Sequence, residues 1–210
     1  MATLLYILAS PRGQRSYSTQ AADAFVESYR KSHPADQIKT VNVFTENLPA
    51  FDGFALQAKY TILHGQTPNP QEVAAWKAVE TVIEEFKAAD KYVFAVPMWN
   101  FGIPYRLKHY LDVIVQPGYT FKFDPQTGYS GLVTGKPVVG IYARGGAYPA
   151  GTPGEGYDLQ KRYMEQILGF IGFTQIQSFA VEPTLQEGPE AAKNYLDKLL
   201  PQLRKTAKTF

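Results

Sequence analysis

The sequence predicts an α/β domain built on a doubly wound, five-stranded parallel sheet with helices on both faces. Short apolar runs of strand length alternate along the chain with amphipathic stretches of helix length, and this alternation recurs five times. The apolar runs are nearly continuous, which is typical of parallel strands buried on both faces. A chain of 210 residues suits one such domain, spanning 1–210, better than two small ones.

The five predicted strands are short and end abruptly in loop residues. The first is followed by Ser10-Pro11-Arg12-Gly13, and the third stops at Pro97, both of which are strong turn signals. The predicted strands cover residues 3–9, 38–44, 92–96, 138–143 and 176–181.

Each predicted helix carries apolar residues at spacings of three and four, so that they share one face. Ser16 and Ser18 stand before the first helix as N-cap candidates, and Pro104 opens the third at the favoured first position. The apolar faces comprise Ala21, Ala22, Phe25, Val26 and Tyr29; Val73, Trp76, Val79, Val82, Ile83 and Phe86; Leu107, Tyr110, Leu111 and Ile114; Leu159, Tyr163, Ile167, Phe170 and Ile171; and Ala192, Tyr195, Leu196, Leu199 and Leu203.

Two segments fall outside this alternation. Residues 47–70 contain several prolines and glycines and are predicted to form a long irregular connection, and residues 119–131 are predicted to form an inserted loop or hairpin. Long connections within compact domains are usually functional or disordered.

Composition excludes several classes of function. The net charge of +2 comes from scattered lysines and arginines, so no nucleic-acid partner is expected. The chain has no cysteine, which excludes disulfides, thiolate metal sites and cysteine nucleophiles and fits a reducing cytoplasm. The apolar N-terminal run lacks the basic start of a signal peptide, and no stretch approaches a membrane span. We expect a cytoplasmic protein without a metal site.

Ligands of such sheets bind beyond the carboxyl ends of the strands, where the strand order reverses. The loop after the first strand, residues 10–18, carries hydroxyls and arginines at a helix start, where backbone N–H groups attract anions. The residues fit a phosphate site, or simply an N-cap with solvated charges. A dinucleotide fingerprint is missing.

The loops after the third and fourth strands also have unusual composition. Pro97-Met98-Trp99-Asn100-Phe101 crowds large apolar groups that either flank a planar ring or plug the space between helix and sheet. In the other loop, Gly145 and Gly146 allow close approach of the backbone to a ligand, or form a plain turn. Together, the three loops indicate a ligand site at one edge of the sheet.

These motifs resemble one known family. Pro97-Met98-Trp99-Asn100-Phe101, Arg144-Gly145-Gly146 and Ser16-Tyr17-Ser18, in this order, resemble the FMN-dependent NADH-azoreductases, which also act as NADH:quinone oxidoreductases. The likeness extends over nearly the whole chain and includes residues 131–136 and 168–172. It implies a flavodoxin-like homodimer with FMN at each of two interfacial sites.

The resemblance also implies roles for individual residues. Those expected to hold the FMN phosphate are Ser10, Ser16, Tyr17 and Ser18; those expected to line the isoalloxazine ring are Pro97, Met98, Trp99, Asn100 and Phe101; and those expected at its pyrimidine side are Arg144, Gly145 and Gly146. Ala143 is also expected to contact the cofactor. Trp99 stands where the family often has Tyr, and Ala143 where it often has Ser, so a side-chain hydrogen bond from Ala143 is absent. Phe123 replaces a Tyr found in some relatives, which makes the substrate pocket more apolar.

The reaction implied is the transfer of reducing equivalents from NADH or NADPH to quinones and azo compounds. The flavin N5 carries the hydride, no side chain is needed as a catalyst, and donor and acceptor share one face, which predicts ping-pong kinetics. Aromatic residues of the two irregular segments are expected to line the substrate pocket, from the same or the partner subunit, or to pack the dimer interface. They include Phe54, Tyr60, Phe121 and Phe123.

Two other classes of protein remain open. An electron-carrier flavodoxin has no substrate of its own, but such carriers are usually acidic and this chain is weakly basic. A non-flavin α/β domain is the second alternative. A P-loop is excluded, because Gly131 to Lys136 is one residue short and lacks the Ser or Thr. A receiver domain would need acidic residues where Ala9 and Ser10 stand.

Overall fold

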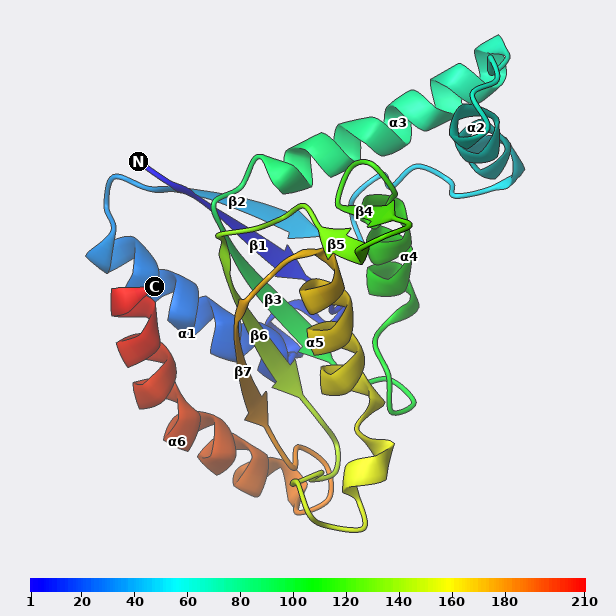
Figure 1. Ribbon diagram of the computed structural model, residues 1–210. Helices are drawn as coiled ribbons and strands as arrows, with labels where there is room; N and C mark the ends of the chain where they lie inside the picture. The colour runs from blue at the N-terminus through cyan, green and yellow to red at the C-terminus, as the bar shows by residue number, and fades with distance from the viewer.

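The computed structural model describes residues 1–210 and contains the predicted parallel sheet (Figure 1). Its strands lie in the order β2-β1-β3-β6-β7, with every neighbouring pair parallel. The order reverses between β1 and β3, which places the switch point where the sequence predicts a ligand site. The strands span Thr3–Leu8 (β1), Gln37–Asn42 (β2), Lys91–Pro97 (β3), Pro137–Ala143 (β6) and Gln175–Val181 (β7).

Helices cover both faces of the sheet, as predicted. On one face α1 and α6 pack side by side, and on the other α3, α4 and α5 cover the strands (Figure 1). Each face therefore has its own apolar core, one around Phe25 and the other around Phe86. The helices span Tyr17–Ser32 (α1), Pro70–Lys87 (α3), Tyr105–Ile114 (α4), Leu159–Ile171 (α5) and Gly188–Thr209 (α6).

The prediction that residues 47–70 are an irregular connection is wrong, because they contain a sixth helix, α2 (Gly53–Leu63). Asp52 begins it, since its carboxylate accepts hydrogen bonds from the N–H groups of Phe54 and Ala55. The helix has no apolar stripe, because Ile62 and Leu63 are exposed alongside Phe54. Without that periodicity the sequence offered no helical signal.

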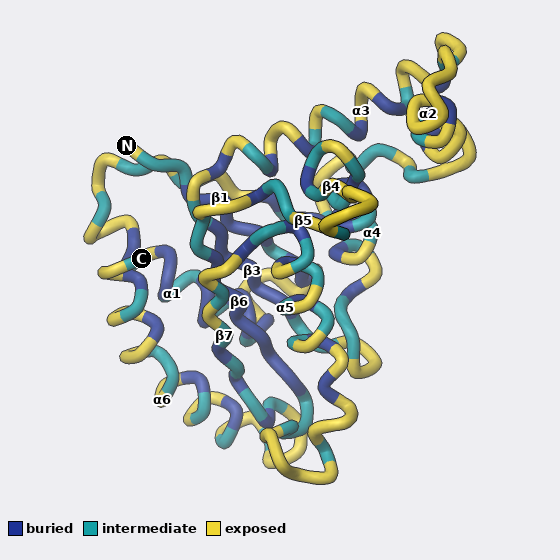
Figure 2. The backbone as a smooth tube through the Cα atoms, viewed as in Figure 1, coloured by how far each residue is buried: buried dark blue, intermediate teal, exposed yellow.

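Helix α2 packs against the first part of α3, and the two project beyond the sheet as an arm (Figure 1). Much of this arm is exposed (Figure 2). The start of α3 is a capping box, in which the Asn69 side chain accepts from the Glu72 N–H and Glu72 accepts from the Asn69 N–H, both at 2.9 Å. These two hydrogen bonds fix the point at which α3 begins.

The insert at 119–131 is a hairpin, which was one of the two predicted forms. Its strands β4 (Phe121–Asp124) and β5 (Gly128–Gly131) pair antiparallel and pack against α5. Gly131 touches the end of α5 so closely that a Cβ would overlap the backbone of Gly172, which itself has a left-handed φ of 116°. A side chain at Gly131 would therefore displace the end of α5.

Candidate active site

A cleft of about 320 Å³ lies at the carboxyl ends of β1, β3, β6 and β7. It contains eight of the residues that the sequence predicted for cofactor binding: Ser10, Ser16, Tyr17, Pro97, Met98, Trp99, Ala143 and Gly145. The remaining lining residues are Arg12, Thr184, Leu185, Gly188 and Pro189. Arg12 is the one charged residue among them, so the lining favours an anion.

The start of α1 forms one end of the cleft. Ser16 is the N-cap, but its hydroxyl caps no backbone group; it lies 3.0 Å from the Ser18 hydroxyl instead. The N–H groups of Tyr17, Ser18 and Thr19 have no partner in the chain, and the buried Thr19 hydroxyl has none either. Ser18 is fully buried and supports Ser16 rather than lining the cleft. This helix start is a ready site for a phosphate.

The loop after β3 is a tight turn from Trp99 to Gly102, closed by reciprocal backbone hydrogen bonds of 3.1 and 2.9 Å. Its central residues Asn100 and Phe101 have φ of 47° and 67°, the signature of a type I′ turn. Asn tolerates this region, whereas Phe adopts it rarely. The turn leaves the N–H groups of both residues without partners in the chain. Phe101 lies against Tyr157, with ring centroids 5.1 Å apart.

The loop after β6 presents further donors. The N–H groups of Gly145, Gly146 and Ala147 make no hydrogen bond within the chain, while the Gly145 carbonyl accepts from Leu185 and Gln186. A Cβ on Gly145 would come within 3.0 Å of the Leu185 side chain. The loop is therefore held by its carbonyls and leaves its N–H groups available, as an anion-binding nest requires.

Arg144 does not point into the cleft. Its side chain is 3% exposed and lies 2.9 Å from Asp158, 3.2 Å from Glu182 and, through Nε, 3.1 Å from Gln160. The Nη2 atom facing Asp158 has no well-aligned hydrogen bond, so that contact is mainly one of charge. Gln160 in turn donates to the Val96 carbonyl at 2.9 Å. These four side chains, the Arg144 network, tie the ends of β3, β6 and β7 to the start of α5.

The sequence analysis missed the loop after β7. Thr184, Leu185, Gly188 and Pro189 line the cleft because β7 neighbours β6, so that their carboxyl ends meet at one edge. Thr184 is fixed there by its N–H and hydroxyl, which both donate to the Arg144 carbonyl. The Gly188-Pro189 pair after the fifth predicted strand was the available sequence signal.

The four residues predicted for the substrate do not line this cleft. Phe121 packs 4.7 Å from the Phe170 ring, and Phe123 is exposed on the hairpin. Phe54 and Tyr60 lie on the exposed arm. Within one subunit, the fold therefore separates these four side chains from the predicted cofactor residues.

No group of His, Asp and Glu side chains in the structure has the arrangement of a metal site. None of its helices has the length and apolar character needed to cross a membrane.

The fold and the cleft define a class of protein. A sheet with this strand order and a donor-rich cleft at its switch point is a flavodoxin-like domain. The family described as having a flavodoxin-like fold matches residues 2–207. The match covers nearly the whole chain.

Curated relatives specify the branch of this class. The FMN-dependent NADH:quinone oxidoreductase of Nitratidesulfovibrio vulgaris strain DP4 is 56% identical over 210 residues and covers 100% of both chains. That of Desulfotalea psychrophila is 51% identical and covers 89% of this chain and 88% of its own length. The chain belongs to this flavodoxin-like family of FMN-dependent NADH:quinone oxidoreductases and is an oxidoreductase.

Solved structures agree with this placement. An azoreductase from Bacillus anthracis strain Sterne superimposes with a TM-score of 0.91 at 28% identity over 100% of both chains. A second B. anthracis structure, an FMN-dependent NADH-azoreductase in complex with FMN, gives 0.87 at 27% identity and covers 99% of this chain and 100% of its own.

The residues present fit FMN. The partnerless N–H groups at the start of α1 and the orphaned Thr19 hydroxyl suit its phosphate. The partnerless N–H groups of Asn100, Phe101, Gly145 and Gly146 suit the carbonyl and nitrogen atoms of its ring. No carboxylate lines the cleft to repel it.

Proposed function

We propose that residues 1–210 act as one FMN-binding domain that oxidises NADH or NADPH and reduces quinones and azo compounds by a ping-pong mechanism. The observation that carries the proposal is the set of backbone N–H donors without partners, which lie at the start of α1 and in two loops that each contribute lining residues to one cleft. Family membership supports the cofactor, and the names of the relatives support the donor and the acceptors.

The chain's own residues bind and orient the cofactor in this proposal. Tyr17, Ser18 and Thr19 donate their N–H groups to the phosphate, the Ser16 hydroxyl adds another donor, and the helix dipole favours its charge. Gly145 and Gly146 donate N–H groups to the pyrimidine edge, where negative charge accumulates on reduction.

When bound, FMN would supply the two-electron redox chemistry that links the nicotinamide donor to the acceptor. Trp99 lines the cleft and Phe101 lies in the same turn, with 38% and 45% of their surface exposed. They provide one apolar wall against which the donor and then the acceptor stack. Sharing one wall requires each to leave before the next binds.

The test begins with flavin binding and reduction. The purified protein titrated with FMN should develop the absorption of bound oxidised flavin, and anaerobic NADH should bleach it. Steady-state rates are then measured with NADH varied at several fixed concentrations of one acceptor, first a quinone and then an azo dye. The double-reciprocal lines should be parallel for each acceptor, since NADH and the acceptor bind in turn. Converging lines would contradict the ping-pong step while leaving flavin binding intact.

Variants at the two ends of α1 locate the phosphate site. Ser16→Ala should weaken FMN binding about tenfold, because a hydrogen bond to a charged group is lost. Ser32→Ala, at the other end of the same helix, should leave FMN affinity unchanged. Equal affinities for both variants would place the phosphate elsewhere.

The same measurements separate the proposal from an electron carrier. Bound flavin that neither NADH nor NADPH reduces would make the chain a carrier without a substrate of its own. A protein that binds no flavin would contradict both functions.

We further propose that the active form is a homodimer in which the arm of one copy covers the cleft region of the other. The arm exposes a run of large apolar side chains: Phe54, Leu56, Tyr60, Ile62, Leu63 and Val73. Exposed apolar surface of this extent marks an interface. A second copy also offers a source for the aromatic residues that the fold keeps away from the cleft of their own subunit.

The oligomeric state tests this arrangement. Wild-type protein should sediment as a dimer, and the double variant Phe54→Ser/Ile62→Ser should dissociate and lose quinone reduction. Leu159→Ser removes a similarly exposed apolar side chain elsewhere and should stay dimeric. A wild-type monomer with full activity would refute the dimer.

A further inference from the structure

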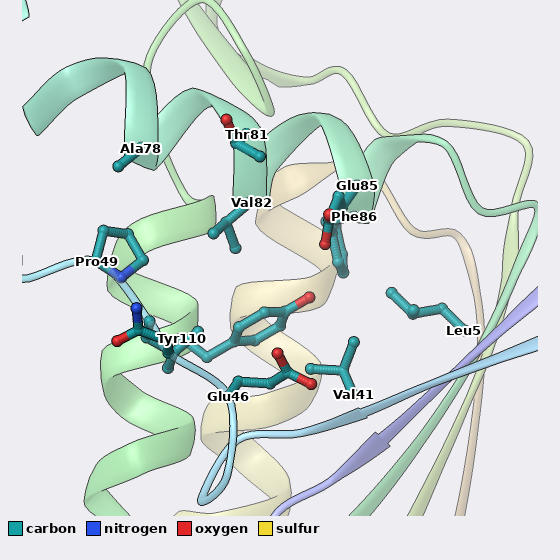
Figure 3. A pocket seen from close by; sticks show the side chains of 12 residues that line it. Leu5, Val41, Glu46, Pro49, Ala78, Thr81, Val82, Glu85, Phe86 and Tyr110 are labelled. Atoms are coloured by element: carbon teal, nitrogen blue, oxygen red, sulfur yellow. The ribbon is translucent and has the colours of Figure 1, made fainter. Parts of the chain in front are cut away.

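A second cavity, of about 430 Å³, lies apart from the cleft that we propose for FMN. It is lined by residues of α3, α4, β1, β2 and the segment 46–49, and it opens to solvent past the exposed residues Glu46, Ala78 and Glu85 (Figure 3). Its volume falls within the range of small-molecule sites, about 300–1,000 Å³. The apolar part of its wall comprises Leu5, Val41, Leu48, Pro49, Ala78, Val82 and Phe86. No residue lines both this cavity and the flavin cleft.

The segment 46–49, which forms one wall of the cavity, is held against α4 by hydrogen bonds. Arg106 donates through Nε to the Val43 carbonyl and through Nη2 to the Glu46 carbonyl, both at 2.7 Å. The ring of His109 lies 2.9 Å, through Nε2, from the Pro49 carbonyl. These contacts make the cavity a formed feature of the fold rather than a gap beneath a loose loop.

Tyr110 of α4 places a polar group inside this apolar space. Its side chain is 2% exposed, and its ring lies across the cavity with the hydroxyl toward Phe86 (Figure 3). Burial, followed by the charges of neighbouring groups including Glu85 and Glu46, raises the pKa of the phenol, and no hydrogen bond contributes. The hydroxyl oxygen is accessible from the cavity and makes no hydrogen bond within the chain, so a bound ligand can use it as a donor or an acceptor.

The charged groups of the cavity are all acidic. Glu46 makes no ion pair with its carboxylate, and Glu85 pairs at 3.3 Å with Lys39, which does not line the cavity; both glutamates are exposed to solvent. No lysine, arginine or histidine lines the space. The lining therefore disfavours phosphates and carboxylates, including both nucleotides of the proposed reaction.

We propose that this cavity binds an organic cation, a protonated amine on a compact apolar or aromatic body. The body packs among Leu5, Val82 and Phe86, and the ammonium group donates to the Tyr110 hydroxyl and to Glu46 or Glu85. An ammonium has several donors and no acceptor, which matches one partnerless hydroxyl and two carboxylates. The site is independent of the flavin, so it stands or falls separately from the proposed function.

Three probes of similar size and different charge test the class of ligand. 2-Phenylethylammonium, 2-phenylethanol and 3-phenylpropionate are titrated into ¹⁵N-labelled, FMN-loaded protein, and amide shifts are followed. The ammonium should bind about tenfold more tightly than the alcohol, because its hydrogen bonds are charge-assisted. The carboxylate should not bind. The shifted amides should belong to residues around the cavity, such as Leu48 and Thr81.

Variants locate the contact. Glu46→Gln and Tyr110→Phe should each weaken the ammonium about three- to tenfold, and thermal unfolding shows whether Tyr110→Phe keeps its fold. Glu84→Gln is the matched control, because Glu84 neighbours Glu85 on α3 but does not line the cavity. Binding without preference for the cation, shifts confined to residues 16–18 and 145–147, or equal effects of Glu46→Gln and Glu84→Gln would each overturn the proposal.

Discussion

Replacing Arg144 by methionine tests whether the Arg144 network positions the loop that carries Gly145 and Gly146 in the cleft proposed for FMN. The substitution keeps most of the volume and removes the guanidinium, which leaves Asp158 buried and Glu182 partly buried without their cation. Removing one partner of a buried ion pair costs about 3–5 kcal/mol. Because the Glu182 side chain keeps 20% of its surface in contact with water, we expect the lower end of that range.

The same substitution should weaken FMN binding. The loop that carries Gly145 and Gly146 loses its anchor to α5 and β7, and each misplaced donor forfeits about 0.5–1.5 kcal/mol. Loss of two donors corresponds to about 1–3 kcal/mol, or about 5- to 150-fold in the dissociation constant. A smaller change in KM for NADH is expected, since no part of the network lines the cleft.

Two measurements separate positioning from general stability. Chemical denaturation of the FMN-free protein gives the free energy of unfolding, and fluorescence titration gives FMN affinity. In an Asp158→Asn background, Arg144→Met should cost less stability, because one stranded carboxylate is gone, while the loss of FMN affinity should persist. Lys31→Met, which breaks the exposed Lys31–Glu27 pair, should change neither quantity measurably. Wild-type FMN affinity in Arg144→Met would refute the reasoning.

Three further predictions concern other parts of the fold. Gly131→Ala should destabilise the protein by about 3 kcal/mol or more by urea denaturation, because its Cβ overlaps the Gly172 backbone; Gly156→Ala, with open space around it, should change stability by less than about 0.5 kcal/mol. Phe101→Val should be about 1–2 kcal/mol less stable than Phe101→Gly, since both lose the ring and only valine must adopt the positive φ; equal stabilities would contradict the strained turn. Hydrogen bonds from the Ala2 N–H and then from the Tyr29 hydroxyl lower the pKa of Asp36 from its ordinary 3.8. The stabilisation that the ionised Asp36 gives the folded state is therefore complete above that pH and is lost as the pH falls through the lower pKa of the folded state. Asp36→Asn should therefore flatten acid unfolding below that pH, and an unchanged profile would exclude this role.

Much of the cleft was predictable, because its residues directly follow strands. Continuous apolar runs identified β1, β3 and β6, and in a parallel sheet the residues after such strands meet at one edge. Ser10, Met98 and Gly145 follow these strands, so local sequence was sufficient to place them together. The predicted hairpin at 119–131 was equally local.

The direction of individual side chains was not predictable in this way. Arg144 was expected at the flavin, yet its partners Asp158 and Glu182 are distant in sequence and become neighbours only when α5 and β7 pack on β6. Helix α2 escaped detection because its apolar residues face outward as well as inward, so no periodic signal exists.

The sequence by itself determined the strand and helix periods, the class of sheet and the loops that form its ligand edge, because each of these depends on residues that are close along the chain. Only the tertiary structure decided which side chains face the cleft, that Arg144 serves as an internal tie, and that Tyr110, Glu46 and Glu85 line a second cavity. Those outcomes depend on contacts between segments far apart in sequence, where packing and charge pairing outweigh local preference.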